Sequence, residues 1–295
     1  MKRRDITISS QGKRCAAWLY LPSESGPFPC VILGQCLGGT RELRLDAYAT
    51  RFVEAGIAAI VFEYRYFGAS EGEPRELVHI ESQLEDWASA IAYARAHTEL
   101  DAERIALWGT SLGGGHAIVS AARVRGLAAV IAQNPFTDGF TNLAAVKPLA
   151  MLPMLARAIK DQFWGWLGQS PSYIKIMGKP DELAIFKSPD VERDLRHLVP
   201  NGVHWKNRIA VRALLSLPFY RPITYASRVE CPLLMCIGNR DTADSPQAAL
   251  KTAQAAPHGE ALCYDCDHYD FYEGAIFEQT VADQCAFLVR HLLRK

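Results

Sequence analysis

The chain has 295 residues, of which 49% are hydrophobic and 22% charged, as is typical of a globular protein. Lys plus Arg and Asp plus Glu number 32 each, so no net charge favours a nucleic acid or an anionic membrane surface. No stretch approaches the roughly 20 apolar residues of a membrane span, and no apolar run follows the basic N-terminus as in a secretory signal, so we expect a cytoplasmic protein.

The first elements along the chain predict a hairpin over residues 6–21, followed from Cys30 by a repeating strand–helix pattern. Such alternation is typical of a mainly parallel sheet with helices on both faces. Strands are expected at 31–33, 57–62, 105–108, 128–132, 233–237 and 261–264. Helices are expected at 43–55, 82–96, 112–124, 246–256 and 277–293.

The alternation stops once, between residues 138 and 224. Leu, Met and Trp recur at helical spacing over 143–166, a hairpin is predicted over 173–186 with its turn at 178–180, and a further helix over 207–217. A segment of this size between two strands is typical of an insertion over one face of a sheet. We therefore expect a core formed by 1–137 and 225–295, with a largely helical cap at 138–224.

The most informative motif is G-x-S-x-G at residues 109–113, between a predicted strand and a predicted helix. A serine on such a turn is raised above the edge of the sheet, and close backbone contacts explain the glycines. A phosphate-binding loop would need Lys followed by Ser or Thr, and a dinucleotide loop would need G-x-G-x-x-G; neither is present. The motif predicts that Ser111 is a nucleophile, and the alternative is a glycine-rich turn without chemistry.

A serine nucleophile needs a base and an acid, which follow it in the order Ser, Asp or Glu, His in enzymes with this turn. Asp241 lies just beyond the strand predicted at 233–237, and Asp244 is the reserve candidate for the acid. His268 follows the last predicted strand and is the expected base, with His204 a distant second. His258 precedes that strand, at the wrong edge of the sheet, and the remaining histidines are interpreted as structural.

An oxyanion hole needs two backbone N–H donors. One is expected from Leu112, which follows the nucleophile at a helix N-terminus. The other is expected from the loop at 34–39, with Leu37 as first choice and Cys36 as second. The alternative for this glycine-rich loop is a simple turn.

Residues 33–42, 61–75, 238–242 and 267–270 together resemble the α/β-hydrolases, in the branch of X-prolyl-peptidase-like hydrolases and polyketide transferases or thiohydrolases. The resemblance implies an α/β-hydrolase fold, a triad of Ser111, Asp241 and His268, and a cap that shapes an acyl pocket. The chain departs from the family where Gln35 and Cys36 replace the usual His-Gly. Cys36 as an alternative nucleophile is disfavoured because Ser111 already occupies the turn.

Five further residues are candidates for the lining of a substrate pocket: Gln35, Tyr64, Trp164, Trp166 and His204. A purely structural role is the alternative for each of them. Cys263 and Cys266 have the spacing of a redox or zinc pair, but no second Cys/His pair accompanies them, so no metal is predicted. All eight cysteines are expected to be reduced.

The sequence thus predicts a serine hydrolase that cleaves a small-molecule ester or thioester through an acyl-enzyme, without a cofactor. Three alternatives stay open: an acyltransferase or cyclase with the same triad, an amide or peptide hydrolase, and a binding protein on a hydrolase fold. The acyl chain and the oligomeric state, a homodimer included, are left open. No nucleic-acid or membrane partner is expected.

Overall fold

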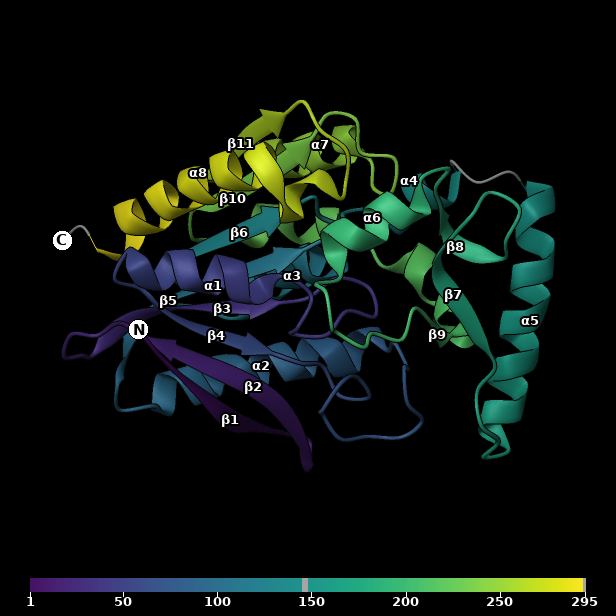
Figure 1. Ribbon diagram of the computed structural model, residues 1–295, viewed down its shortest axis with the longest axis horizontal. Coiled ribbons are helices and arrows are strands. Elements are labelled where there is room, and N and C mark those ends of the chain that lie inside the picture. Colours follow the sequence, from purple (N-terminus) through teal and green to yellow (C-terminus); the bar gives the residue numbers. More distant parts are fainter. Residues whose placement is uncertain (145–147, 294–295) are drawn as a thin grey trace.

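The computed structural model describes residues 1–144 and 148–293 (Figure 1). Its main sheet has eight strands in the order β1-β2-β4-β3-β5-β6-β10-β11. These strands are β1 (Lys2–Ser10), β2 (Lys13–Leu21), β3 (Phe28–Gly34), β4 (Ala58–Phe62), β5 (Leu100–Thr110), β6 (Ala129–Gln133), β10 (Leu233–Gly238) and β11 (Gly259–Tyr264).

The sheet is parallel from β4 to β11, and β1 and β2 join it antiparallel at one edge. Every residue of β3, β4, β6 and β10 is buried, which explains why their sequences are continuous apolar runs. By contrast, β11 lies at the other edge and is largely exposed. The predicted hairpin and the mainly parallel sheet are therefore confirmed.

Helices cover both faces of this sheet: α1 (Leu45–Glu54) and α8 (Gly274–Leu292) pack together, and so do α2 (Ile80–Ala96) and α3 (Leu112–Arg123) (Figure 1). Trp87 of α2 lies against Gly34 at the end of β3. From β5, Trp108 donates a hydrogen bond of 2.9 Å to Gln284 of α8. With α7 (Pro246–Ala255), all five helices predicted for this part of the chain are present, within a few residues of their expected bounds.

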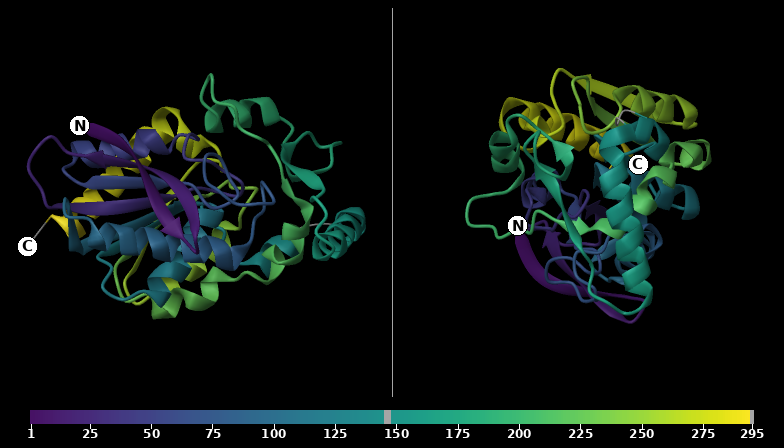
Figure 2. Two further views of the ribbon diagram at one scale, coloured as in Figure 1. Left: turned by 90° about the horizontal axis from the view of Figure 1, so that it is seen from below. Right: turned by 90° about the vertical axis from the view of Figure 1, so that its right-hand side faces the viewer.

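The segment between β6 and β10 projects from one end of the main sheet (Figure 2). It contains a second sheet of three strands in the order β8-β7-β9, and α5 lies on its outer side (Figure 1). Its elements are α4 (Gly139–Ala144), α5 (Pro148–Trp166), β7 (Tyr173–Gly178), β8 (Ala184–Lys187), α6 (Val191–Leu198), β9 (Ile209–Ala210), and the 3-10 helices η1 (Val211–Leu215), η2 (Leu217–Phe219) and η3 (Pro222–Arg228). The helix predicted over 143–166 corresponds to α4 and α5, apart from residues 145–147, which lie outside the described residues.

Two predictions for this segment are wrong. Strands β7 and β8 pair in parallel, not as a hairpin. Glu182 accepts hydrogen bonds from the Lys175 side chain and the Lys179 backbone. These bonds hold the connection between the two strands in a loop, after which β8 runs in the same direction as β7. The helix predicted over 207–217 is instead β9 followed by η1, because Ile209 and Ala210 pair with β7.

Within residues 1–144 and 148–293, no helix combines the length and apolar character of a membrane span. The cysteines are free thiols, including the exposed Cys263 and the buried Cys266. No group of three or more His, Cys, Asp or Glu side chains in the described part of the chain is arranged to hold a metal ion.

Candidate active site

Ser111 occupies a strained turn between β5 and α3. Its φ is 52° and its ψ is −120°, a conformation that side chains other than glycine rarely adopt. A Cβ at Gly109 would lie 2.1 Å from the carbonyl oxygen of Gly113, and one at Gly113 would lie 2.4 Å from that of Gln35. Both positions therefore require glycine. This geometry raises a serine at the carboxyl end of a strand.

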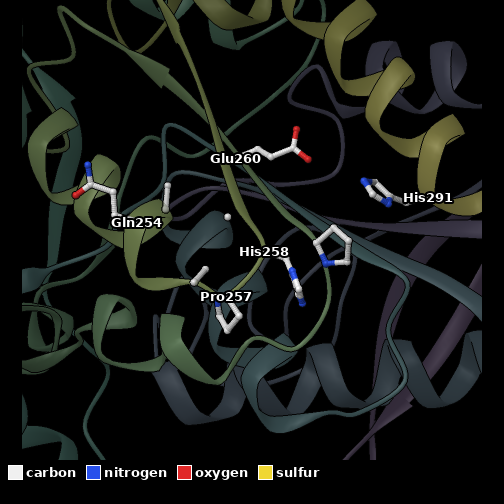
Figure 3. Close-up of a pocket in the computed structure, with 9 residues that line it drawn as sticks. Gln254, Pro257, His258, Glu260 and His291 are labelled. Atoms are coloured by element: carbon white, nitrogen blue, oxygen red, sulfur yellow. The ribbon is translucent and has the colours of Figure 1, made fainter.

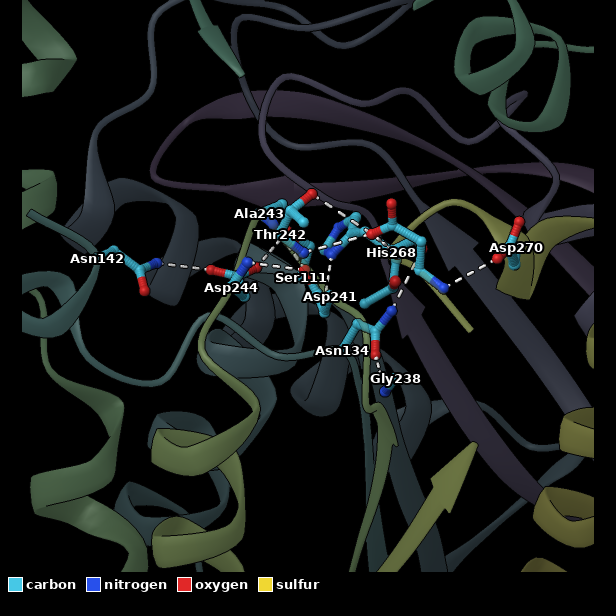
Figure 4. Close-up of polar contacts among 12 residues, drawn as sticks. Ser111, Asn134, Asn142, Gly238, Asp241, Thr242, Ala243, Asp244, His268 and Asp270 are labelled. Atoms are coloured by element: carbon cyan, nitrogen blue, oxygen red, sulfur yellow. Dashed lines mark hydrogen bonds and ion pairs between the residues drawn. The ribbon is translucent and has the colours of Figure 1, made fainter. Parts of the chain in front are cut away.

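The imidazole of His268 is hydrogen-bonded to Asp241, with 2.7 Å between Nδ1 and Oδ2 (Figure 4). Asp241 lies in the loop after β10, and its Oδ1 accepts backbone hydrogen bonds of 2.8 Å from Ala243 and 2.9 Å from Asp244. These contacts fix the carboxylate in position. The acid named first from the sequence is thus the one that faces His268.

Asn134 ties this loop to the loop that carries His268. Its Oδ1 accepts a 2.8 Å hydrogen bond from the backbone of Gly238, and its Nδ2 donates one of 3.2 Å to the carbonyl of His268 (Figure 4). The sequence analysis missed this residue. Its position directly after β6, at the carboxyl edge of the sheet, was the available signal.

His268 is buried among carboxylates. Burial lowers its pKa, but the charge of Asp241 and the hydrogen bond to it, with smaller contributions from Asp244 and Asp267, raise the pKa to about 9. This raised pKa favours the protonated imidazole in the resting site. The imidazole becomes a base once it has lost that proton.

The hydroxyl of Ser111 is hydrogen-bonded to Asp244, with 3.2 Å between Oγ and Oδ2 (Figure 4). Among the described residues Oγ makes no other hydrogen bond, so no hydrogen bond joins Ser111 to His268. Asn142 of α4 donates 2.7 Å to the other oxygen of Asp244. Burial raises the pKa of the Asp244 carboxyl, although the charge of nearby His268 acts in the opposite direction. The reserve acid thus contacts the nucleophile and not the imidazole.

The loop after β3 is held by the buried side chain of Gln35. Its Nε2 donates hydrogen bonds to the carbonyls of Thr40 (3.2 Å) and Leu43 (2.8 Å), and its Oε1 accepts 2.8 Å from the Cys36 N–H. Both ends of the Gln35 amide thus bind backbone and are not free to bind a substrate. Cys36 as the second choice of oxyanion donor is wrong, because its N–H is already bonded to Gln35.

Two other N–H groups remain near this turn. Leu112 is the first residue of α3, where the helix provides no acceptor for its N–H. The Leu37 N–H has no acceptor among the described residues. The segment inserted between β6 and β10 contacts the same loop, since Trp205 donates a 2.9 Å hydrogen bond to the carbonyl of Gly38.

The thiol of Cys36 is half-buried. Burial, with a smaller effect of the Asp244 charge, raises its pKa to about 12. A thiol, not a thiolate, therefore lies in this loop. This argues against Cys36 as an alternative nucleophile.

The other residues predicted to line a substrate pocket have varied surroundings. Tyr64 is buried and its hydroxyl accepts a 3.0 Å hydrogen bond from Trp87, so it belongs to the core. Trp164 and Trp166 are 43% and 77% exposed on α5, so they face solvent. His204 is exposed and lines a surface cavity together with Trp18 of β2.

Three of the histidines that the sequence analysis did not predict to be catalytic illustrate their positions in the structure. His258 precedes β11 and lines a surface pocket with His291 at the amino-terminal edge of the sheet (Figure 3). His116 is buried between the Tyr220 hydroxyl, at 2.7 Å, and Gln83 Oε1, at 2.9 Å. Burial lowers the pKa of His116 to about 3, so this ring is a neutral part of the core.

Residues 11–153 match the family described as X-Pro dipeptidyl-peptidase (S15 family). The quorum-quenching protein AidA of Acinetobacter baumannii (strain MDR-ZJ06) is 40% identical over 286 residues, which cover 97% of this chain and 94% of that protein. The polyketide transferase ATR5 of Stachybotrys chlorohalonatus (strain IBT 40285) is 25% identical over 313 residues and covers 99% and 98% of the two chains.

Among solved structures, the alpha/beta hydrolase GrgF from Penicillium sp. sh18 superposes with a TM-score of 0.84 at 23% identity, over 100% of both chains. At this identity the likeness concerns the fold. Together with the sequence relatives, it covers the main sheet and the projecting segment alike.

Proposed function

The chain belongs to the α/β-hydrolase superfamily and is an enzyme, and from this premise we propose that it is a serine hydrolase acting on an ester or thioester through an acyl-enzyme. Ser111 is the nucleophile, His268 the general base and Asp241 the carboxylate that orients it. The observation that carries the proposal is the 2.7 Å contact between His268 and Asp241, on loops at the same sheet edge as the strained turn of Ser111.

The first half of the reaction begins when the Ser111 hydroxyl turns from Asp244 to the neutral His268. Nε2 takes the proton as Oγ forms a bond to the carbonyl carbon, and the Leu112 and Leu37 N–H groups stabilise the oxyanion. The bond from carbon to the leaving oxygen or sulfur then breaks. His268 gives its proton to the alcohol or thiol that departs.

In the second half a water molecule attacks the acyl-enzyme. Nε2 of His268 removes a proton from the water as its oxygen bonds to the carbonyl carbon. The bond to Ser111 Oγ breaks, Oγ regains the proton from His268, and the free acid leaves. These steps need no cofactor.

A fluorophosphonate probe and phenyl esters test this proposal. Wild type should be labelled and should release phenol, whereas S111A should do neither and H268A should lose most of its activity. H258A is the matched control, because His258 is an exposed histidine at the opposite edge of the sheet. An unlabelled wild type would support the alternative that the protein binds a ligand without catalysis. Full activity in H268A would contradict the assignment of His268 as the general base.

Acyl transfer is the second candidate function, favoured by the relative named a polyketide transferase, which aligns over 99% of this chain. An alcohol would then replace water in the second half. Product analysis by mass spectrometry, with and without added alcohols, separates an ester product from a free acid. Matched amides in the same assay test peptide or amide cleavage.

The relative named a quorum-quenching protein supports a narrower form of the hydrolase proposal. The substrate would then be a signal molecule with an ester bond, open-chain or cyclic. Comparing a lactone with its open-chain ester tests this. A ring-opened acid from the lactone is the expected product.

A further inference from the structure

Asp244 is a buried carboxylate beside the nucleophile that no step of the proposed reaction uses. Its residue is 6% exposed, and each carboxylate oxygen has a neighbour: Oδ1 accepts 2.7 Å from Asn142 and Oδ2 accepts 3.2 Å from Ser111 (Figure 4). Asp241 holds the imidazole, so Asp244 is not needed as the acid of a triad.

The position of Asp244 is fixed from two sides. Its backbone N–H donates 2.9 Å to Oδ1 of Asp241, which belongs to the same loop. Asn142, from α4 in the inserted segment, holds Oδ1 from the other side. Oδ2 is therefore directed at the nucleophile and cannot turn away without breaking these contacts.

Because Ser111 has one hydroxyl proton, it cannot donate to Asp244 and His268 at the same time. This proton must leave Asp244 and face His268 before attack. Oδ2 of Asp244 loses its donor at the moment when the substrate occupies the site and displaces water. A buried carboxylate oxygen without a donor is unfavourable. A hydrogen-bond donor on the substrate would satisfy it.

We propose that Asp244 is a specificity-determining residue, which selects acyl substrates that carry an N–H or O–H group close to the scissile carbonyl, as on the carbon next to it. This inference rests on the proposed function, because it assumes that Ser111 attacks that carbonyl. Its basis is the 3.2 Å separation of Oδ2 from Ser111 Oγ.

The position of the donor follows from that separation. A hydrogen bond to Oδ2 spans about 2.9 Å. The attacked carbon is bonded to Oγ, and Oδ2 lies 3.2 Å from Oγ, so a donor that reaches Oδ2 lies no more than about 7–8 Å from this carbon. A group on the α-carbon or β-carbon meets this requirement, whereas a donor far along an extended acyl chain does not.

Two pairs of phenyl esters test the proposal in the wild-type enzyme. N-acetylglycine phenyl ester is compared with its N-methyl analogue, and phenyl glycolate with phenyl methoxyacetate, each kcat/KM being divided by the rate constant of hydroxide-catalysed hydrolysis. We expect a preference of about tenfold to a hundredfold for the member with the donor. Equal normalised values in both pairs would overturn the proposal.

The variant D244N separates specificity from a structural effect. Asn has nearly the shape of Asp, but its NH₂ group can occupy the place of Oδ2, where it donates and does not accept. The preference in both pairs should disappear, with most of the change in the substrates that carry the donor. D265N, which alters a carboxylate that is 84% exposed, should keep the preference. A D244N enzyme with the wild-type preference would overturn the assignment.

These outcomes are distinguishable from failure of the proposed function. If wild type cleaves no ester and resists the fluorophosphonate, both proposals fall. If it cleaves the esters without discrimination, only the selection by Asp244 falls. If D244N is unstable, N142A is the second variant: it leaves Asp244 in place without its Asn142 donor and should weaken the preference.

Discussion

Ser111 donates its hydroxyl hydrogen bond to Asp244, 3.2 Å away, although the imidazole of His268 belongs to the same cluster of side chains. One loop after β10 therefore supplies two carboxylates with different neighbours: Asp241 binds the base and Asp244 binds the nucleophile. In the resting site each of these carboxylates therefore has a side-chain partner. Substrate binding has to exchange one of these hydrogen bonds for another.

The first prediction concerns pH. Since His268 acts as a base only when neutral and its pKa is raised to about 9, kcat/KM for a phenyl ester should keep rising until about pH 9. The charges that face the imidazole are Asp241, Asp244 and Asp267, so D244N should move this rise to lower pH. A plateau reached near the ordinary histidine pKa of about 6.5 would contradict the assignment.

The second prediction concerns the glycine before the nucleophile. In G109A the new Cβ would lie 2.1 Å from the Gly113 carbonyl oxygen, so the turn must shift. We expect a loss of about 1–3 kcal/mol in the free energy of unfolding, measured by denaturant titration, and a large fall in kcat. The comparison is G168A, whose Cβ meets nothing within 4 Å but whose φ of 74° costs about 1–2 kcal/mol. G168A should keep its kcat; an equal fall in kcat in both variants would exclude a special turn at Gly109.

The order of strands and helices was predictable because the core strands are apolar runs and the helices between them are amphipathic. Val31 and Ile60, for example, are fully buried in adjacent parallel strands. The inserted segment was harder to predict. The parallel pairing of β7 and β8 depends on contacts of Glu182, which strand periodicity does not record.

The pairing of His268 with Asp241 was predictable because the carboxyl ends of parallel strands share one edge. The neighbours of Asp244 were not predictable, since its partner Asn142 comes from α4 in the inserted segment, more than a hundred residues earlier. Gln35 illustrates a different limit. Its sequence position indicated the loop, but not that its side chain turns inward to bind the backbone.

The third prediction concerns Gln35. Q35L removes hydrogen bonds to the carbonyls of Thr40 and Leu43 and to the Cys36 N–H, so the loop that presents Leu37 should relax. We expect kcat to fall by about 10²- to 10³-fold, the effect of losing one oxyanion donor, with a smaller change in KM. Q169L, at an exposed glutamine, is the control. Unchanged kcat in Q35L would remove this loop from the oxyanion hole.

The fourth prediction concerns Cys36. Because burial raises the pKa of its thiol to about 12, iodoacetamide at neutral pH should leave Cys36 unmodified and the esterase activity intact. The exposed Cys263 should be alkylated first, as peptide mass mapping would show. C36A should retain fluorophosphonate labelling. A folded C36A variant that is no longer labelled would indicate that Cys36, not Ser111, is the nucleophile.

The fifth prediction concerns the attachment of α5 to the rest of the inserted segment. Burial raises the pKa of Asp161. Its hydrogen bonds and the charge of Arg212 together lower the pKa by more than burial raises it, so the pKa lies below its ordinary value. This contribution to stability is present above the unfolded pKa of about 3.9 and is lost as pH falls through the folded pKa. D161N leaves the half-buried Arg212 without its carboxylate partner, which costs up to about 3–5 kcal/mol. Hydrogen exchange should therefore accelerate in α5 while β5 keeps its protection, and D181N, at an exposed carboxylate, should show neither change. Equal acceleration in α5 and β5 would mean that the segment and the sheet unfold together.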